Sequence, residues 1–381
     1  MNRRRTMMLE KGKISPRQTG QLVFLTILAT VILFVPAITA SIAGHDAWLA
    51  TISGSMFGLV TLFFVAWLGH KHPGQTIFQY SETILGRYLG KLVGLAYVWI
   101  FVHVASVVVR EFGDFMTTSF MPNTPLSVFN FSLLLLGAWA VIAGVEVIAR
   151  MSEFIIILVV SFLLLIIVLS VPNWDLGNML PFFSHGAMPI LEAAIIPAAW
   201  HGEIIVLAVF LPFMTRPGRA FLAGGTAIVS SGMLLTLGVI GTLTIFGPEL
   251  TSSFRFPLHL FVRTINLGNL LTRFEVVVMV TWVAGVFIKT AVLYYCASLG
   301  LAQVLGLSEY RPVVLPLGII MATLSITLFV DVTELVEFLS KTWPRYGISI
   351  YFFGLPLLLF LITVIRQKFF DTRFEGNQKH E

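Results

Sequence analysis

The sequence predicts an all-α integral membrane protein with about ten transmembrane helices. Hydrophobic residues fill 57% of the 381 positions and charged residues only 11%, which is far from the composition of a soluble globular domain. The apolar residues also form runs of about 18 or more, the length that a helix needs to cross roughly 30 Å of hydrocarbon. The predicted helices span residues 19–43, 48–69, 90–112, 126–145, 153–172, 188–213, 220–246, 273–299, 312–331 and 345–366.

The net charge of +5 comes from basic residues in short segments between the apolar runs. These segments lack the aromatic interleaving of a nucleic-acid surface, so we expect no nucleic-acid partner and interpret them as signals of membrane topology. The single cysteine, Cys296, excludes an internal disulfide and a cysteine-based metal site, and we expect no metal or other cofactor. The first apolar run is too long for a removed signal peptide.

The distribution of Lys and Arg predicts the orientation of the chain. If the N-terminus is cytoplasmic, most basic residues fall in inside segments, and the exceptions are Arg255, Arg263, Arg273, Lys341 and Arg345. This bias places both termini in the cytoplasm.

Two connections contain more than a simple loop. The segment HPGQTIFQYSETILGRYLGK, residues 72–91, has apolar residues at helical spacing, which is typical of a short helix in the cytoplasmic interface. The segment PNWDLGNMLPFFSHGAMP, residues 172–189, is expected to pack over the extracellular mouth.

That second segment divides five predicted helices from five. An odd number per half inserts the second half upside down relative to the first, as in transporters built from inverted repeats. The predicted division is a basic N-terminal tail at residues 1–13, a first repeat at 14–172, an extracellular connection at 173–187, a second repeat at 188–368 and a C-terminal tail at 369–381.

The helix at 188–213 carries the strongest signal of a ligand site. Pro197, His201, Gly202 and Glu203 occur together in the middle of an apolar run. Proline removes a backbone donor, glycine weakens the helix, and ionisable residues inside a membrane mark functional positions. A discontinuous helix facing a cavity accounts for all four residues. The alternative is a proline kink with a hydrogen-bonded polar cluster between packed helices.

The helix at 273–299 carries a polar stripe. Glu275, Trp282 and Lys289 are spaced by seven residues, which places them near one face of the helix. Lys289 lies well inside the apolar run, where an ammonium is costly. We expect it to be a fixed cation in the cavity that pairs with a ligand carboxylate or with Glu203, or replaces a coupling ion; the alternative is that its long stem snorkels to the interface.

Other ionisable residues give weaker signals. His103 and Arg110 share a face of the helix at 90–112, with Glu111 beside Arg110, and we interpret the latter two as an ion pair near the outer end. Glu146, Arg150 and Glu153 have the spacing of ion pairs on one helical face, with structural support and gating as open alternatives.

The sequence lacks the common motifs of enzymes. It contains no P-loop, no HExxH, no nucleophile elbow and no Rossmann glycine pattern. We therefore do not expect an enzyme, nor a pump driven by ATP hydrolysis within this chain.

Several segments, in this order and spacing, resemble the spore germination permeases. These are the B subunits of nutrient germinant receptors of endospore-forming bacteria, within the amino acid/polyamine/organocation superfamily. The resemblance covers Lys13 to Phe370 and is carried by ISPRQ (Ile14 to Gln18), HDAWLA (His45 to Ala50), PGQTIFQYSETILGRYLGK (Pro73 to Lys91), MPNTPL (Met121 to Leu126), GVEVIARMSE (Gly144 to Glu153), Gly202-Glu203 followed by LPF, and RFE with Trp282 and Lys289.

The resemblance implies a LeuT-like fold whose first and sixth helices are unwound at the ligand site. It also implies that the chain senses a small nutrient, typically an amino acid, in the inner membrane of the spore beside receptor A and C subunits. The ligand-binding positions carried over with it, together with His103, are Ala29, Thr30, Val31, Ala198, Trp200, His201, Gly202, Glu203, Trp282 and Lys289.

The sequence departs from the family in its first helix. Family members commonly show glycines where this chain has Ala29 and Val31, and these side chains narrow the approach to the backbone. A different ligand, or a receptor that has lost ligand binding, therefore remains open. Two other functional classes are also open: an amino acid transporter that works by alternating access, and a scaffold subunit that binds no ligand. The sequence does not identify the nutrient or a coupled ion.

Overall fold

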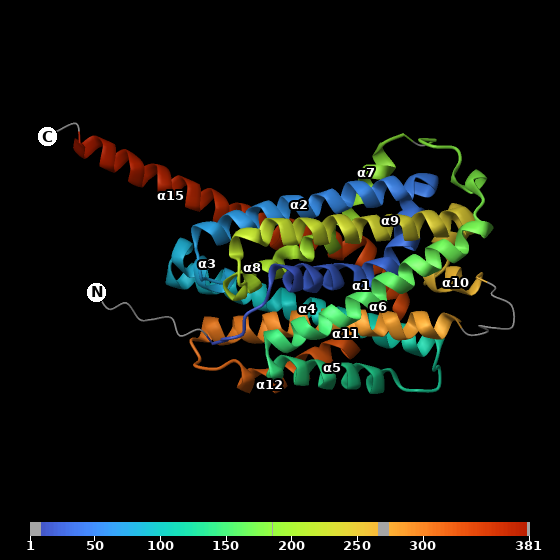
Figure 1. Cartoon of the computed structure of the whole chain (residues 1–381), viewed down its shortest axis with the longest axis horizontal. Helices are drawn as coiled ribbons and strands as arrows, with labels where there is room; N and C mark the ends of the chain where they lie inside the picture. Colours follow the sequence, from blue (N-terminus) through green and yellow to red (C-terminus); the bar gives the residue numbers. More distant parts are fainter. Residues whose placement is uncertain (1–8, 185, 266–273, 379–381) are drawn as a thin grey trace.

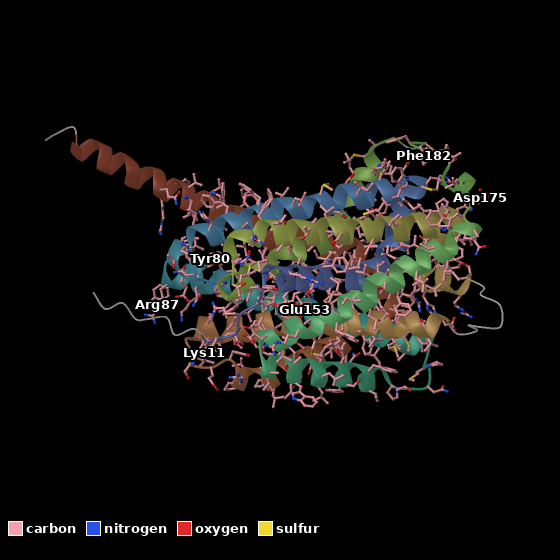
Figure 2. All side chains as sticks on the ribbon, viewed as in Figure 1. Lys11, Tyr80, Arg87, Glu153, Asp175 and Phe182 are labelled. Carbon is pink, nitrogen blue, oxygen red and sulfur yellow. The ribbon has the colours of Figure 1, made fainter. Side chains whose placement is uncertain are left out.

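The computed structural model describes residues 9–184, 186–265 and 274–378 of the chain. Residues 1–8 of the predicted N-terminal tail, Arg273 and residues 379–381 lie outside the described residues. Long helices run side by side along the bundle, and the described chain begins and ends at the same end of it (Figure 1). Lys11, Tyr80 and Arg87 lie at that end, whereas Asp175 and Phe182 lie at the other (Figure 2).

The first half of the chain forms six helices and short 3₁₀ turns. Its elements are α1 (Pro16–Ala43), η1 (Gly44–Asp46), α2 (Ala47–Lys71), α3 (Ile77–Leu85), α4 (Arg87–Ser119), α5 (Leu126–Ala143), α6 (Val145–Ser170), η2 (Val171–Asn173) and η3 (Leu176–Met179). α3 is the predicted interfacial helix. Its N-terminus is fixed by a capping box between Thr76 and Gln79, which satisfies backbone donors that the helix leaves free.

The second half is more irregular. It comprises α7 (Met188–Gly202), η4 (Glu203–Val206), α8 (Leu207–Phe210), η5 (Leu211–Phe213), η6 (Pro217–Arg219), α9 (Ala220–Ser253), α10 (Pro257–Arg263), α11 (Phe274–Leu305), α12 (Arg311–Thr327), α13 (Val332–Glu337), the π-helical η8 (Phe338–Thr342), α14 (Trp343–Tyr346), the π-helical η9 (Gly347–Phe352) and α15 (Gly354–Gln378). α9 bends at Gly247, whose positive φ of 72° precedes Pro248.

The described residues contain eight helical stretches long and apolar enough to cross a membrane. The first, Pro16–Lys71, holds both α1 and α2, which the η1 turn joins, and α12 is a shorter apolar helix. Each of the ten predicted helices therefore has a counterpart, and the chain is a multi-pass membrane protein.

The predicted boundary of the last helix was wrong. The helix was expected at 345–366 but begins at Val332, where the Asp331 carboxylate accepts hydrogen bonds from the backbone N–H groups of Thr333 and Glu334. The first part of this helix contains charged residues such as Glu337 and Lys341, so it does not form an apolar run. Two π-helical segments then surround Pro344, because a proline cannot supply its backbone donor to a regular helix.

α1 lies at the centre of the bundle and packs against α9, α11, α7 and α6. A capping box between Ser15 and Gln18 starts it, and it continues without interruption through Ala29 and Val31 to Ala43. The expectation that the first helix is unwound is therefore not met. A β-carbon at these positions favours helix over the open backbone that glycine permits.

The sixth predicted helix does change its geometry at the predicted place. α7 continues past Pro197 and ends at Gly202, and the chain then tightens into the 3₁₀ turn η4, which begins at Glu203. The discontinuity is thus a tightened turn rather than an open loop. Such 3₁₀ segments within helices often mark functional positions.

The connection after α6 packs over one end of the bundle, as predicted. The Asp46 carboxylate accepts a hydrogen bond from the Phe183 backbone N–H at 2.9 Å, and the Asn178 side-chain amide donates to the Thr244 carbonyl at 2.9 Å. These bonds tie the connection to η1 and to α9.

Candidate functional site

A fully buried ion pair joins α11 to η4. The Lys289 Nζ atom lies 2.8 Å from Glu203 Oε2 and 3.0 Å from Glu203 Oε1, and the exposed fractions of the two side chains are 0% and 3%. Snorkelling of Lys289 is therefore excluded. Two charges at this depth are stable only as a pair, because each alone carries a large cost of desolvation.

Thr30 of α1 completes the polar contacts of this pair. Its hydroxyl oxygen accepts one hydrogen bond from Lys289 Nζ and another from the Trp200 indole N–H, each at 3.0 Å. Three elements, α1, α7–η4 and α11, thus meet at one hydroxyl group. Of the predicted ligand-binding positions, the structure brings together Thr30, Trp200, Glu203 and Lys289.

Glu111 of α4 also lies at this site, which corrects the interpretation of it as part of an ion pair near the outer end. It is 1% exposed, and its polar neighbours are Lys289, Glu203 and Thr30. Arg110, its neighbour in the sequence, instead pairs with Asp114 at 2.8 Å and donates a hydrogen bond to the Phe329 carbonyl at 2.6 Å. The spacing of four residues, rather than adjacency, decides the partner of Arg110 because side chains four apart share a helix face.

We call Thr30, Glu111, Glu203 and Lys289 the charged cluster. The cavity that it lines with Trp200 has a volume of about 10 Å³, which is near the minimum for a single water molecule. The site is closed in this structure, since no nutrient of the size of an amino acid fits beside the ion pair.

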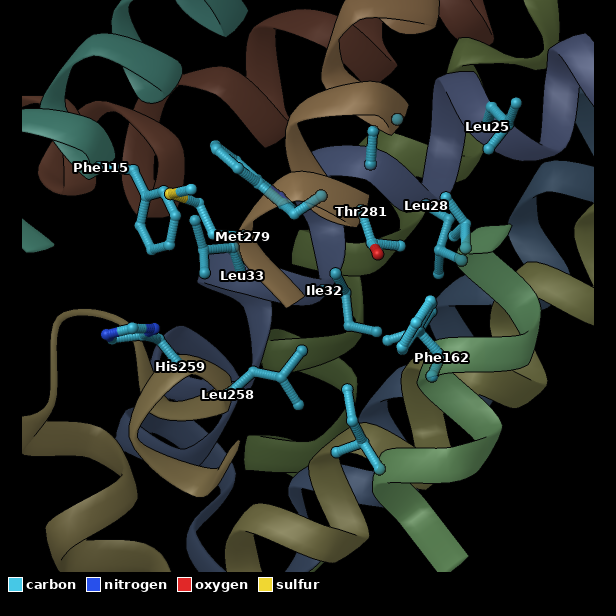
Figure 3. A pocket seen from close by; sticks show the side chains of 16 residues that line it. Leu25, Leu28, Ile32, Leu33, Phe115, Phe162, Leu258, His259, Met279 and Thr281 are labelled. Carbon is cyan, nitrogen blue, oxygen red and sulfur yellow. The ribbon is translucent and has the colours of Figure 1, made fainter. Parts of the chain in front are cut away.

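A second, apolar pocket lies next to the charged cluster, with a volume of about 50 Å³. Figure 3 shows its wall: Leu28 and Ile32 from α1, Phe162 from α6, Leu258 from α10 and Phe115 from α4. The predicted positions Ala29 and Trp282 line this pocket rather than the cluster. Mostly apolar walls with a few polar groups are typical of small-molecule sites.

The other predicted ligand-binding residues lie outside both pockets. His103 packs among the rings of Trp99, Phe338 and Tyr346. The Nδ1 atom of His201 lies 2.9 Å from the Pro197 carbonyl oxygen, and its Nε2 atom lies 3.3 Å from the Ser231 hydroxyl. These two histidines therefore resemble packed side chains more than ligands.

The remaining predicted ligand-binding positions lie where helices pack against one another. A β-carbon at Gly202 would approach the Phe352 ring to 2.5 Å, so this glycine permits close packing of α7 against η9. The backbone of Ala198 lies close to Gly54 of α2, and Val31 is fully buried within the bundle. None of the three lines the charged cluster.

Only part of the polar stripe predicted on α11 lies in the interior of the bundle. Lys289 belongs to the charged cluster, and Trp282 packs against the rings of Phe112 and Phe115. Glu275, however, pairs with Arg263 of α10 at 3.0 Å and is partly exposed. On α6, Arg150 and Glu146 form the predicted ion pair at 3.4 Å.

The backbone trace has the LeuT-type fold. The structure superposes on MhsT in complex with L-phenylalanine with a TM-score of 0.64, covering 93% of this chain and 99% of that one at 13% sequence identity. A Na⁺-coupled sialic acid symporter gives a TM-score of 0.64 at 11% identity, covering 92% of this chain and 78% of that one. These similarities establish the fold, and the fold class predicted from the sequence is confirmed.

Sequence comparison identifies the family. The profile described as "Spore germination protein" matches residues 13–330. Spore germination protein KB of Bacillus subtilis (strain 168) is 25% identical over 364 residues, which are 94% of this chain and 97% of the relative. Spore germination protein YndE of the same strain is 25% identical over 370 residues, covering 94% and 98%. The chain belongs to the spore germination protein family, as the resemblance predicted.

Proposed function

We propose that this chain is the permease-like B subunit of a spore nutrient germinant receptor, which binds a small nutrient within the membrane and triggers germination. The support is its membership of the spore germination protein family over residues 13–330. The proposal places it in the inner membrane of the spore, with both termini cytoplasmic, beside receptor A and C subunits. Its role there is binding and signalling rather than catalysis.

The observation that carries the proposal is the Lys289–Glu203 pair at the 3₁₀ turn η4. An ammonium held by a carboxylate inside a LeuT-type bundle is a site where a ligand carboxylate can replace the protein's own. Lys289 would then bind the carboxylate of an amino acid, and Glu203 would be released. This is the first of the three roles that the sequence suggested for Lys289.

The apolar pocket supplies the second part of the proposed ligand site. Ala29 and Thr30 are consecutive in α1, and Gly285 and Lys289 are one turn apart in α11, so each helix contributes to both pockets. An amino acid whose carboxylate met Lys289 would place its side chain toward the apolar pocket. We therefore narrow the proposed ligand-binding set to Ala29, Thr30, Trp200, Glu203, Trp282 and Lys289.

Binding in this way requires a second arrangement of the helices. The closed cavity of about 10 Å³ admits no amino acid, so η4 and α11 must separate before or during binding. A ligand that binds only the separated arrangement shifts the population toward it. The proposed signal is this shift, transmitted from the two five-helix halves, residues 14–172 and 188–368, to the partner subunits.

The test is nutrient-triggered germination of spores that carry this gene with its neighbouring subunit genes. Spores are exposed to single amino acids, and loss of refractility is measured for the wild type, Glu203→Gln and Lys341→Met. The last is a matched control, because Lys341 pairs with Glu337 at 2.8 Å on the exposed surface. Immunoblots of spore membranes establish that the subunits are present at equal levels.

We expect Glu203→Gln to change the concentration of nutrient needed for germination and Lys341→Met to leave it unchanged. A response identical to the wild type in Glu203→Gln, at equal protein level, would contradict the proposed ligand site. The scaffold interpretation would then be favoured.

Amino acid transport is the second candidate function, and the LeuT-type fold favours it. The two functions differ in flux. Purified protein in lipid vesicles is supplied with a radiolabelled amino acid that triggers germination, and accumulation is compared with empty vesicles. Uptake above that background would support transport, whereas binding without uptake would support a receptor.

A further inference from the structure

One buried carboxyl group of the charged cluster has no cation of its own. Glu111 is 1% exposed, it shares a hydrogen bond with the Thr30 hydroxyl, and its Oε2 atom has no hydrogen-bond partner among the described residues. The cation adjacent to it in the sequence is not available, because Arg110 is bound to Asp114 and to the Phe329 carbonyl. The proposed ligand site above uses the Lys289–Glu203 pair and leaves Glu111 without a role.

The N–H donors nearest to Glu111 are engaged by other groups. An ammonium group has three N–H donors, and Lys289 lies within hydrogen-bond distance of Glu203 Oε1, Glu203 Oε2 and the Thr30 hydroxyl. The Trp200 indole N–H also goes to Thr30. The cluster thus holds two carboxyl groups and one ammonium, and the ammonium is taken by Glu203.

Apart from Lys289 and the Thr30 hydroxyl, the surroundings offer Glu111 little that would stabilise a negative charge. It lies eight residues before the end of α4 at Ser119, which is roughly 12 Å along the helix, and the cavity beside it has room for about one water. The charged groups that face it are Lys289 from α11, Glu203 from η4 and Asp114 from its own helix. Two of these three are carboxyl groups, which repel a further negative charge.

We propose that Glu111 is a proton-binding site of the closed structure, occupied at neutral pH and adjacent to the Lys289–Glu203 ion pair. A buried carboxyl group without a cation of its own is more stable neutral than ionised. With the proton bound, the cluster has one positive and one negative charge and is balanced.

Release of this proton acts directly on the ion pair. An ionised Glu111 competes with Glu203 for Lys289, since both carboxylates face the same ammonium. The proton, which passes to solvent when it leaves, thereby stabilises the arrangement in which Lys289 holds Glu203. The proton site rests on this geometry alone and does not depend on the proposed receptor function.

The experiment is infrared spectroscopy of the purified full-length chain in lipid at neutral pH. Exposed carboxyl groups are ionised there, whereas a protonated buried carboxyl group absorbs separately through its C=O stretch. The wild type is compared with Glu111→Gln, and Asp114→Asn is the matched control on the same helix. Melting temperatures are measured for these proteins and for Glu203→Gln.

We expect the protonated-carboxyl band in the wild type and in Asp114→Asn, and its loss in Glu111→Gln. Since glutamine replaces a neutral group by a neutral group, Glu111→Gln should melt close to the wild type. Glu203→Gln, which removes a charge from the ion pair, should melt at a clearly lower temperature.

Three results would overturn the proposal. The band is absent from the wild type, or it persists in Glu111→Gln, or Glu111→Gln lowers the melting temperature more than Glu203→Gln does. The last result would mean that Glu111 is ionised in the folded protein. A Glu111→Gln chain that does not fold counts as this result. Each of these measurements is independent of germination, so a failure of this proposal can be distinguished from a failure of the proposed receptor function.

Discussion

The charged cluster and the apolar pocket share three helices but offer a ligand opposite properties. α1, α4 and α11 contribute Thr30, Glu111 and Lys289 to the cluster, and Ala29, Phe115 and Gly285 to the pocket. The cluster has charge and a cavity of about 10 Å³, whereas the pocket has about 50 Å³ and few polar groups. On α11, a residue that lines the pocket, Gly285, is about one helical turn from Lys289, and a ligand carboxylate that binds Lys289 must displace Glu203.

Removal of the cation from the charged cluster should reduce the stability of the protein more than any change in the apolar pocket. Lys289→Met leaves Glu203 buried without its partner, which we expect to lower the free energy of unfolding by about 3–5 kcal/mol. The measurement is thermal unfolding of the purified protein in detergent. Replacing the whole pair, Lys289→Met with Glu203→Gln, should recover part of the loss because no unpaired charge then remains.

The control for this variant is an exposed ion pair. Lys341 and Glu337 lie 2.8 Å apart with side chains 67% and 62% exposed, and solvent screens such pairs. Lys341→Met should therefore change stability far less than Lys289→Met. Equal effects would contradict the view that burial gives the Lys289–Glu203 pair its importance.

Thr30 tests whether α1 takes part in the charged cluster. Thr30→Val keeps the shape of the side chain but removes the acceptor of the bonds from Lys289 and Trp200. We expect a loss of about 1–3 kcal/mol in the free energy of unfolding, measured by thermal unfolding. Thr26→Val is the matched control, because this equally buried hydroxyl bonds only to the Leu22 carbonyl of its own helix; a loss of the same size there would contradict a special role for Thr30.

The sequence predicted more of the charged cluster than of the space around it. Pro197, Gly202 and Glu203 in an apolar run indicated an irregular helix, which agrees with the geometry. Lys289 was expected to pair with a ligand carboxylate or with Glu203, or to replace a coupling ion, and the structure shows the pairing with Glu203. Glu111 was misassigned because its neighbour Arg110 suggested an ion pair, whereas Asp114 takes that arginine. Comparing the number of buried charged groups with the number of their available partners would have assigned Glu111 to the cluster. Burial, however, is known only from the fold.

Backbone continuity was equally hard to predict. A break in α1 was expected by analogy with the family, yet Ala29 and Val31 support a continuous helix. The choice depends on packing against α9, α11 and α7, which no local pattern in α1 contains. The apolar pocket was missed for the same reason, since its walls come from helices far apart in the sequence.

The apolar pocket can be narrowed without touching the charged cluster. A β-carbon at Gly285 would lie 3.7 Å from the Ala29 β-carbon and 3.9 Å from Val159 Cγ2, which are ordinary contact distances. Gly285→Ala should therefore raise the free energy of unfolding by about 0.5–1 kcal/mol, because alanine favours helix over glycine. Thermal unfolding measures this gain.

Gly285→Ala should also weaken the response to nutrients with large side chains more than to those with small ones, if the pocket receives that side chain. Gly300→Ala is the contrasting variant on the same helix. A β-carbon there would approach the Phe78 ring to 2.3 Å, so we expect destabilisation instead. A loss of stability in Gly285→Ala would contradict the pocket that its contacts define.

The smallest expected effect is a dependence on pH at the α10 end of the apolar pocket. His259 lies there against the rings of Phe115 and Phe120, and burial lowers its pKa below the ordinary value of 6.5, with Glu275 opposing and Arg263 assisting this shift. The folded state therefore binds this proton less readily than the unfolded state, so stability falls as the pH decreases below about 6.5. Hydrogen exchange of the α10 backbone, compared between about pH 7.5 and 5.5, should show faster exchange relative to the intrinsic rate at the lower pH. His259→Phe should remove that difference while keeping the ring contacts, and a difference that persists in this variant would assign the titration to another group.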